Sequence, residues 1–223
     1  MTAPDTLSTR NVTITLVATP FIVAAALLPV VGYLLVARGV EPDALEKTLQ
    51  PLIAWPVAIG FMIALGLCWK MAGGDGYRLR DLGWQPPTVA DIALGLGLGG
   101  LVGWLNSGWV FPLIEAVKPG FDPTLSAIDA PTLMAMMAVS IVAEDTLYRG
   151  YALVHLERRY GTLAAVGLTS FSYALLAPGQ GLWLIGWAAC FGTALCGLRL
   201  WRGNLWPVVI VHWLVALAPR LLR

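Results

Sequence analysis

Charged residues are scarce in this sequence. Only 12% of its 223 residues are Asp, Glu, Lys or Arg, whereas 58% are hydrophobic, and the mean hydropathy is +0.75. Soluble domains carry about 25% charged residues, so the composition excludes a soluble globular protein and predicts an integral membrane protein. The formal net charge is +1. With no basic run and no acidic tail, the sequence gives no indication of a nucleic-acid partner.

Cysteine and histidine are also rare, with three and two copies. Cys68, Cys190 and Cys196 all lie in apolar stretches, which favours packing over disulfide bonds. No Cys-x-x-Cys pair or His/Cys cluster indicates a metal site, and Glu144 with His212 would lack a third ligand. Neither Gly-x-Ser-x-Gly nor His-Glu-x-x-His occurs, so a serine hydrolase or a zincin has no support. We expect no metal and no cofactor.

Long apolar runs dominate the sequence instead. They predict an all-α, polytopic transmembrane helical bundle of about seven spans, and an eighth short or re-entrant segment stays open. The expected spans are residues 12–37, 51–72, 91–114, 132–155, 161–178, 181–199 and 205–219. The first run is too long for a signal peptide and is not followed by a small-residue cleavage site. We expect two units, residues 1–90 with two transmembrane helices and a polar loop, and a core over residues 91–223.

Basic residues outside these spans are unevenly divided between the two sides. Five fall on one side, and eight fall on the side of the N-terminus: Arg10, Lys70, Arg78, Arg80, Arg158, Arg159, Arg199 and Arg202. Because cytoplasmic loops collect Lys and Arg, the distribution predicts a cytoplasmic N-terminus in the cytoplasmic (inner) membrane.

Glycines mark two further features. Gly95, Gly99 and Gly103 form a four-residue ladder in the third span, which favours close helix packing within the bundle over a dimer contact. The connection over residues 72–90 is rich in Gly and Pro and is expected to be a linker, although its Leu82-Gly83-Trp84 could be a short interfacial segment.

The polar stretch Ala143–Gly150 interrupts the fourth span. On an α-helix Asp145 and Arg149 are four residues apart and can pair on one face, while Glu144 lies on a face turned by about 100° and is left free. Ionisable groups at membrane depth cost about 2.5–3.5 kcal/mol each on insertion scales, so they persist when they are paired or functional. The residues alone leave two readings open: chemistry or transport at Glu144, and an ion pair that only fixes helix packing.

Few other polar groups fall inside the spans. His212 lies in the last span, and a solitary histidine there is more often a packing residue than a functional one. The fifth span carries a hydroxyl-rich stripe of Thr169, Ser170, Ser172 and Tyr173, whose hydroxyls commonly bond a carbonyl of their own helix. His155 stands next to Glu157 and Arg158 and is expected to be solvated at the interface.

Two blocks together resemble a known family. Glu144-Asp145-Thr146-Leu147-Tyr148-Arg149-Gly150 is similar to the Glu-Glu-x-x-x-Arg motif, followed by Gly, of the CPBP family. This family, also called Abi, comprises CAAX proteases and bacteriocin-processing proteins of membranes. The run from Gly192 through Gly203-Asn204-Leu205 to His212 looks like its C-terminal block. The resemblance covers roughly residues 91–219.

The sequence departs from the family at four positions. Asp145 replaces the second Glu. In the second motif, Phe-x-x-x-His, Tyr173 takes the Phe position and Ala177 takes the His position. In the third motif, His-x-x-x-Asn, His212 is kept but Ala216 replaces the Asn.

The resemblance implies an intramembrane glutamic-type endopeptidase with an altered site, acting on a membrane protein or a hydrophobic-tailed peptide. Glu144 would activate a water, His212 would stabilise the oxyanion, and Asp145 with Arg149 would be the supporting pair. Tyr148, Ser172 or Tyr173 could replace the missing His through a water.

Two alternatives stay open. Ala177 and Ala216 would enlarge and dry the pocket, which suits a catalytically inactive relative that acts as a membrane assembly factor, scaffold or immunity-type protein. A small transporter that uses Glu144 has the least support, because no inverted repeat or pair of broken helices is present.

Overall fold

The structure is a computed structural model, and it describes residues 9–41, 48, 52, 54–117, 126, 128–176 and 182–222. Every regular element within these ranges is helical, and they contain no strand. The elements are α1 (Thr9–Gly32), η1 (Tyr33–Ala37), α3 (Ala54–Gly74), α4 (Val89–Leu105), η3 (Asn106–Val110), α5 (Phe111–Val117), α6 (Ala130–Asp145), η4 (Thr146–Ala152), α7 (Leu153–Tyr160), α8 (Thr162–Ala174), α9 (Leu182–Arg202) and α10 (Trp206–Leu222).

Within the part of the chain that the structure describes, five helical segments are long and apolar enough to cross a membrane, so the chain is a multi-pass membrane protein. They are Arg10–Ala37, Trp55–Gly74, Val89–Ala116, Ala130–Tyr160 and Leu182–Arg202. Each coincides with a predicted span. The other two predicted spans correspond to α8, with 13 residues, and α10, with 17. Thirteen residues rise only about 20 Å, against a hydrocarbon core of about 30 Å.

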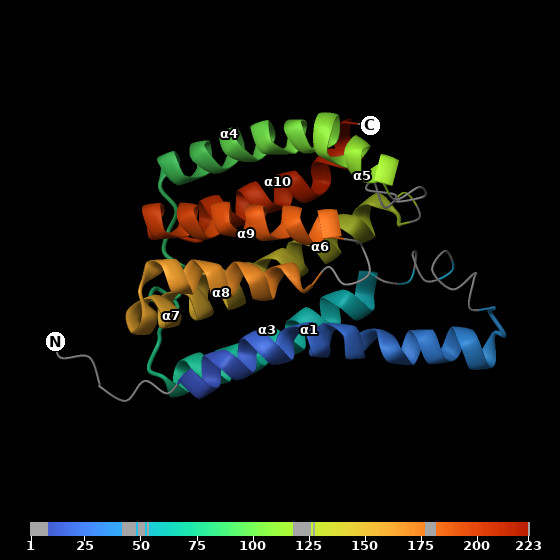
Figure 1. The fold of residues 1–223 in the computed structure, drawn as a ribbon, viewed down its shortest axis with the longest axis horizontal. Coiled ribbons are helices and arrows are strands. Elements are labelled where there is room, and N and C mark those ends of the chain that lie inside the picture. The colour runs from blue at the N-terminus through green and yellow to red at the C-terminus, as the bar shows by residue number, and fades with distance from the viewer. Residues whose placement is uncertain are drawn as a thin grey trace.

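The helices lie roughly side by side, as Figure 1 shows, with α4 at one edge and the α1–α3 hairpin at the other. α4 packs along α10, α1 packs along α3, and α8 packs between α7 and α9. α6 contacts both α3 and α10. The helix that carries the Glu144 motif is therefore the link between the N-terminal hairpin and the C-terminal helices.

The glycine ladder of α4 packs within the bundle, as predicted. An added Cβ would lie 2.8 Å from Ile210 at Gly95, 2.8 Å from Leu214 at Gly99 and 2.8 Å from Ala218 at Gly103. Real Cβ atoms do not approach this closely, so hydrogen at these three positions is what lets α4 lie directly on α10.

The motif helix is not a regular α-helix. Thr146–Ala152 is π-helical, with hydrogen bonds that span five residues instead of four, and it joins α6 to α7 without a break. The prediction of a uniform α-helix is wrong for this segment. π-Helical turns are energetically poorer than α-helical ones and are frequent at functional sites. Here the π-turn begins directly after Glu144 and Asp145.

The connection between α3 and α4 packs tightly against this π-turn. Leu82 is buried, and its carbonyl oxygen would lie 2.9 Å from a Cβ at Gly150. The Trp84 indole N–H donates to Thr146 Oγ1 at 3.0 Å. The described segment contains no regular element, as expected of a linker, but it is anchored to the π-turn by the Trp84–Thr146 hydrogen bond and by the packing of Leu82 on Gly150.

The start of α10 fixes the same connection from its other side. The backbone N–H of Leu205 donates to the Gly83 carbonyl at 3.0 Å. Gly83 has φ +97°, and an added Cβ would lie 2.7 Å from Nε of Arg199. Glycine is required here both for the left-handed backbone and for the close approach of that guanidinium.

Candidate active site

A buried ion pair forms the base of the site. Arg149 and Asp145 have side chains that are 0% exposed, and Nη1 of the guanidinium lies 3.2 Å from Oδ1 of the carboxylate. The pairing of these residues, four apart in the sequence, is confirmed. Each charge compensates the other where neither reaches solvent, because a lone buried charge would be far costlier.

Asp145 also holds the histidine of the last helix. Its second oxygen, Oδ2, lies 3.2 Å from Nδ1 of His212. An ionised carboxylate only accepts hydrogen bonds, so the proton of a neutral His212 resides on Nδ1. Nε2 then presents its lone pair on the opposite side of the ring.

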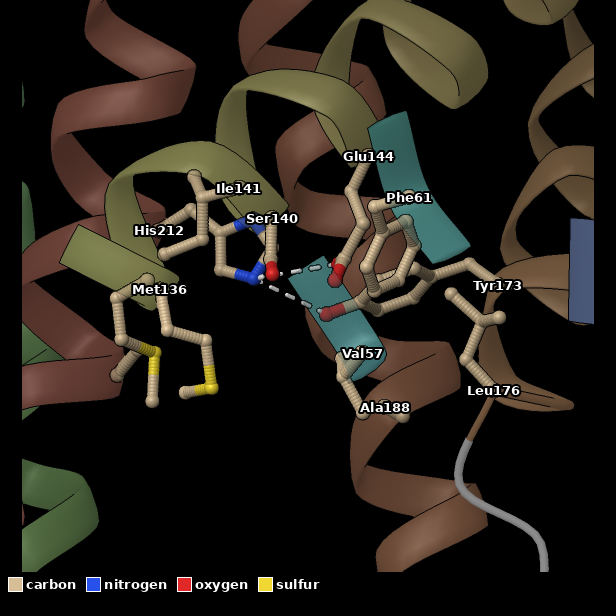
Figure 2. Close-up of a pocket in the computed structure, with 12 residues that line it drawn as sticks. Val57, Phe61, Met136, Ser140, Ile141, Glu144, Tyr173, Leu176, Ala188 and His212 are labelled. Atoms are coloured by element: carbon tan, nitrogen blue, oxygen red, sulfur yellow. Dashed lines mark hydrogen bonds and ion pairs between the residues drawn. The ribbon is translucent and has the colours of Figure 1, made fainter. Parts of the chain in front are cut away.

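That second nitrogen faces two further polar groups. The Tyr173 hydroxyl lies 3.2 Å from Nε2 of His212 and can donate to it, and Oε2 of Glu144 lies 3.9 Å from the same nitrogen. Figure 2 shows the Glu144, Tyr173 and His212 side chains converging from α6, α8 and α10. His212 is therefore held at one nitrogen and available to a proton at the other.

The tyrosine ring is fixed by the guanidinium. Cζ of Arg149 lies 4.0 Å from the Tyr173 ring centroid, a cation–π contact in a water-poor environment. Gly192 of α9 makes room for this stack, because an added Cβ would lie 3.0 Å from Tyr173 Cδ1 and 3.3 Å from Arg149 Nη2. α9 thus packs directly against the Tyr173 and Arg149 side chains.

The three groups border a cavity of about 260 Å³. Val57 and Phe61 of α3, Met136 of α6 and Ala188 of α9 give it a mainly apolar lining. Glu144 is 13% exposed and His212 is 8% exposed, so both are nearly buried. An apolar chamber with a few convergent polar groups is typical of small-molecule and peptide sites.

The candidate site residues fall into two groups. Glu144, Asp145, Arg149, His212 and Tyr173 meet at one place. Ser172 and Tyr148 do not border the cavity: the first donates to the Leu16 carbonyl of α1 at 2.9 Å, and the second packs edge-on against the Tyr173 ring at 5.8 Å. Of the two replaced motif positions, Ala216 lines the cavity, and Ala177 lies outside the described residues.

Sequence reasoning missed Ser140, which lines the cavity one helical turn before Glu144. Its spacing of four residues from Glu144 is a signal that could have found it, because residues i and i+4 share a helix face.

The expectation for His155 is wrong. This histidine is fully buried, with Nδ1 3.4 Å from the Tyr77 hydroxyl and 3.9 Å from Oδ2 of Asp75. Tyr151 donates to the same Asp75 oxygen at 2.6 Å. The charged residues that follow His155 in sequence suggested solvation, whereas its burial is set by a loop some 80 residues upstream. This cluster joins α7 to the end of α3, and none of its residues lines the cavity.

These features define a polytopic helical membrane protein with a carboxylate, an imidazole and a buried guanidinium around one intramembrane cavity. Residues 126–218 match the family model of the type II CAAX prenyl endopeptidase Rce1-like proteins. This part of the chain is therefore an Rce1-like domain of the CPBP (Abi) family, as the motifs predict, and it includes Glu144, Arg149 and His212. No curated protein and no solved structure matches the chain.

Proposed function

We propose that the protein is an intramembrane endopeptidase of the glutamic type that cuts a membrane protein or a hydrophobic-tailed peptide. The observation that carries the proposal is the approach of Glu144 Oε2 to within 3.9 Å of His212 Nε2 at an apolar cavity, while Asp145 holds the other nitrogen of the ring. A carboxylate and an imidazole that face one cavity are suited to general acid–base chemistry.

In the proposed reaction, Glu144 takes a proton from a water as the water oxygen bonds to the peptide carbonyl carbon. When a second proton occupies Nε2, His212 donates from Nε2 to the oxygen that becomes negative, and this oxyanion stabilisation is usually a large part of catalysis. The C–N bond then breaks, and the proton held by Glu144 passes to the leaving amine. Asp145 and Arg149 act as positioning residues that orient the His212 ring.

Tyr173 takes part of the role of the histidine that this chain lacks at Ala177. Its hydroxyl contacts Nε2 of His212 at 3.2 Å and lines the same cavity. The Arg149 guanidinium over its ring at 4.0 Å restricts its movement. A fixed hydroxyl at this place can hydrogen-bond the attacking water.

The proposed setting is the cytoplasmic (inner) membrane, with the N-terminus in the cytoplasm. The excess of Lys and Arg on the side of the N-terminus supports this orientation. In this setting α8 and α10 complete a bundle of about seven spans. Relatives of the CAAX prenyl endopeptidase type act on membrane-anchored proteins, and we propose a substrate of that kind.

The test uses the purified full chain in liposomes with a panel of single-span and tail-anchored peptides, analysed by mass spectrometry in H₂¹⁸O. Wild type is expected to produce cut peptides with ¹⁸O in the new carboxylate. Glu144→Gln is expected to lower the rate by about 10²–10⁴-fold, the usual contribution of a positioned general base. Glu157→Gln makes the same chemical change at a carboxylate that bonds Thr162 near the surface, and it serves as the matched control.

Equal cleavage by wild type and Glu144→Gln would refute the proposal. The alternative, a catalytically inactive member that acts as an assembly factor, scaffold or immunity-type protein, is favoured by Ala216, which gives the cavity an apolar methyl group. It predicts that wild type leaves the whole panel intact while binding a panel peptide as tightly as Glu144→Gln does.

A further inference from the structure

Ser140 has an unused hydroxyl. The residue is 6% exposed, and no atom within the described ranges hydrogen-bonds to its buried Oγ. Serine and threonine in membrane helices usually bond a carbonyl one turn earlier. Thr19 does so at 2.7 Å, Thr146 at 2.6 Å and Thr193 at 2.9 Å. Ser140 departs from this pattern.

The position of this hydroxyl is defined by its helix. Met136, Ser140 and Glu144 follow one another at four-residue spacing on α6, and all three line the cavity. Figure 2 shows Ser140 projecting into the cavity from α6, in the region where Glu144 and His212 meet. A buried polar group without a partner is destabilising. We therefore expect the Ser140 hydroxyl to form a hydrogen bond with a group of the ligand that enters the cavity.

The contacts favour a donor over a nucleophile. A serine nucleophile needs a base within hydrogen-bond reach, and the described partners of Nε2 of His212 are Tyr173 and Glu144, with none from Ser140. The Ser140 oxygen is therefore left with its proton. In a mainly apolar cavity, the complementary group is a hydrogen-bond acceptor such as a peptide carbonyl oxygen.

We propose that the Ser140 hydroxyl donates a hydrogen bond to the carbonyl oxygen of the scissile peptide bond and strengthens this bond as the oxygen becomes negative. This inference rests on the proposed endopeptidase function and adds a donor that faces the carbonyl from α6. His212 and Ser140 then hold the same oxygen from two helices.

The kinetic experiment compares wild type, Ser140→Ala, Ser140→Thr and Thr193→Ala in liposomes with one panel peptide that wild type cuts. Ser140→Ala is expected to lower kcat by about 10²–10³-fold, as seen when one oxyanion donor is removed, with little change in KM. Ser140→Thr retains a hydroxyl and is expected to recover most of kcat. Thr193→Ala removes an exposed hydroxyl that bonds its own helix and is expected to leave both constants unchanged.

A binding experiment tests the donor without any turnover. Two peptide ligands differ only at the position of the scissile carbonyl, where one carries a secondary alcohol and the other carries CH₂. For wild type, the dissociation constant of the alcohol ligand is expected to be about tenfold lower than that of the CH₂ ligand, which corresponds to one hydrogen bond. Ser140→Ala is expected to lose the part of this preference that Ser140 contributes and to keep the part that comes from His212.

The outcomes separate the two proposals. If Glu144→Gln cuts at the wild-type rate, the proposed glutamic-type function is wrong, whatever Ser140 does. If Ser140→Ala keeps the wild-type kcat and the preference for the alcohol while Glu144→Gln is inactive, the inference about Ser140 is wrong and the function stands. Labelling of Ser140 by a fluorophosphonate would also overturn the donor role, because it would identify a nucleophile.

Discussion

Two long apolar helices of this protein satisfy their polar groups in opposite ways. The N-terminal segment Arg10–Ala37 has only 11% of its most apolar stretch buried in the bundle, and Thr15 and Thr19 bond carbonyls of their own helix, with Thr15 also 3.2 Å from Met71 Sδ of α3. In Ala130–Tyr160 the corresponding share is 44%, and Asp145 and His155 find partners on distant elements. For example, the Asp145 carboxylate connects α6 both to η4, through Arg149, and to α10, through His212.

The difference shows where the sequence of a membrane helix constrains the rest of the fold. A hydroxyl that bonds its own backbone is independent of its surroundings. A charge that is paired across helices fixes the positions of its neighbours, and its removal leaves a buried partner without compensation. The motif helix is therefore expected to be far less tolerant of substitution than α1.

The largest effect is expected at the buried guanidinium. Arg149→Met leaves Asp145 as an uncompensated charge, so the free energy of unfolding should fall by about 3–5 kcal/mol. The measurement is denaturant titration in detergent micelles, followed by tryptophan fluorescence. Arg38→Met at the exposed end of η1 makes the same change and should cost at most about 0.5 kcal/mol. Equal losses for the two variants would show that the ion pair has no special role in stability.

A second variant sharpens this result. Asp145→Leu combined with Arg149→Met removes both charges, and such apolar replacement of a buried pair is often close to neutral. The double variant should be more stable than Arg149→Met alone. A further loss in the double variant would contradict the explanation by an uncompensated carboxylate.

A smaller effect is expected from two glycines. Gly150→Ala forces a Cβ to within 2.9 Å of the Leu82 carbonyl oxygen, and overpacking of this kind costs about 1–3 kcal/mol. Gly32→Ala at the end of α1 has no atom within 4 Å of the added Cβ and should stabilise the helix by up to about 1 kcal/mol. Thermal unfolding of both variants in one detergent gives the comparison. A loss at Gly32 as large as that at Gly150 would contradict it.

The smallest effect is expected from two tryptophans. Trp84→Phe keeps an aromatic ring but removes the N–H that donates to Thr146, at a cost of about 1 kcal/mol. Trp55 of α3 is 55% exposed, and Trp55→Phe should change stability by less than half as much. Limited proteolysis between α3 and α4 should speed up for Trp84→Phe alone. Unchanged proteolysis there would mean that this hydrogen bond does not hold the loop.

Much of the architecture follows from local sequence. Seven apolar runs coincide with helical segments, because hydropathy and chain length determine which segments can cross a bilayer. The pairing of Asp145 with Arg149 also follows from local sequence, because residues four apart on a helix lie on one face. The packing of α4 on α10 could also be inferred, because Gly95, Gly99 and Gly103 offer a flat surface at one helical spacing.

Three features could not be inferred, and each depends on distant residues. The π-turn at Thr146–Ala152 shifts the hydrogen-bond pattern by one residue, and no local propensity marks its place. His155 is buried through Asp75 and Tyr77, far away in the sequence. The link from Asp145 to His212 spans 67 positions; the family resemblance places both residues in one site, but no local pattern gives the hydrogen bond between them.

The placement of Asp145 between a guanidinium and an imidazole has a consequence for the electrical state of the membrane interior. With both members ionised, the charges of Asp145 and Arg149 cancel. One proton shared by Glu144 and His212 then makes the whole cluster neutral. Water that donates a proton here, and an amine that later receives it, leave the chamber with the formal charge it had before. Hydrolysis can therefore proceed in a medium of low dielectric constant without a counter-ion crossing the lipid.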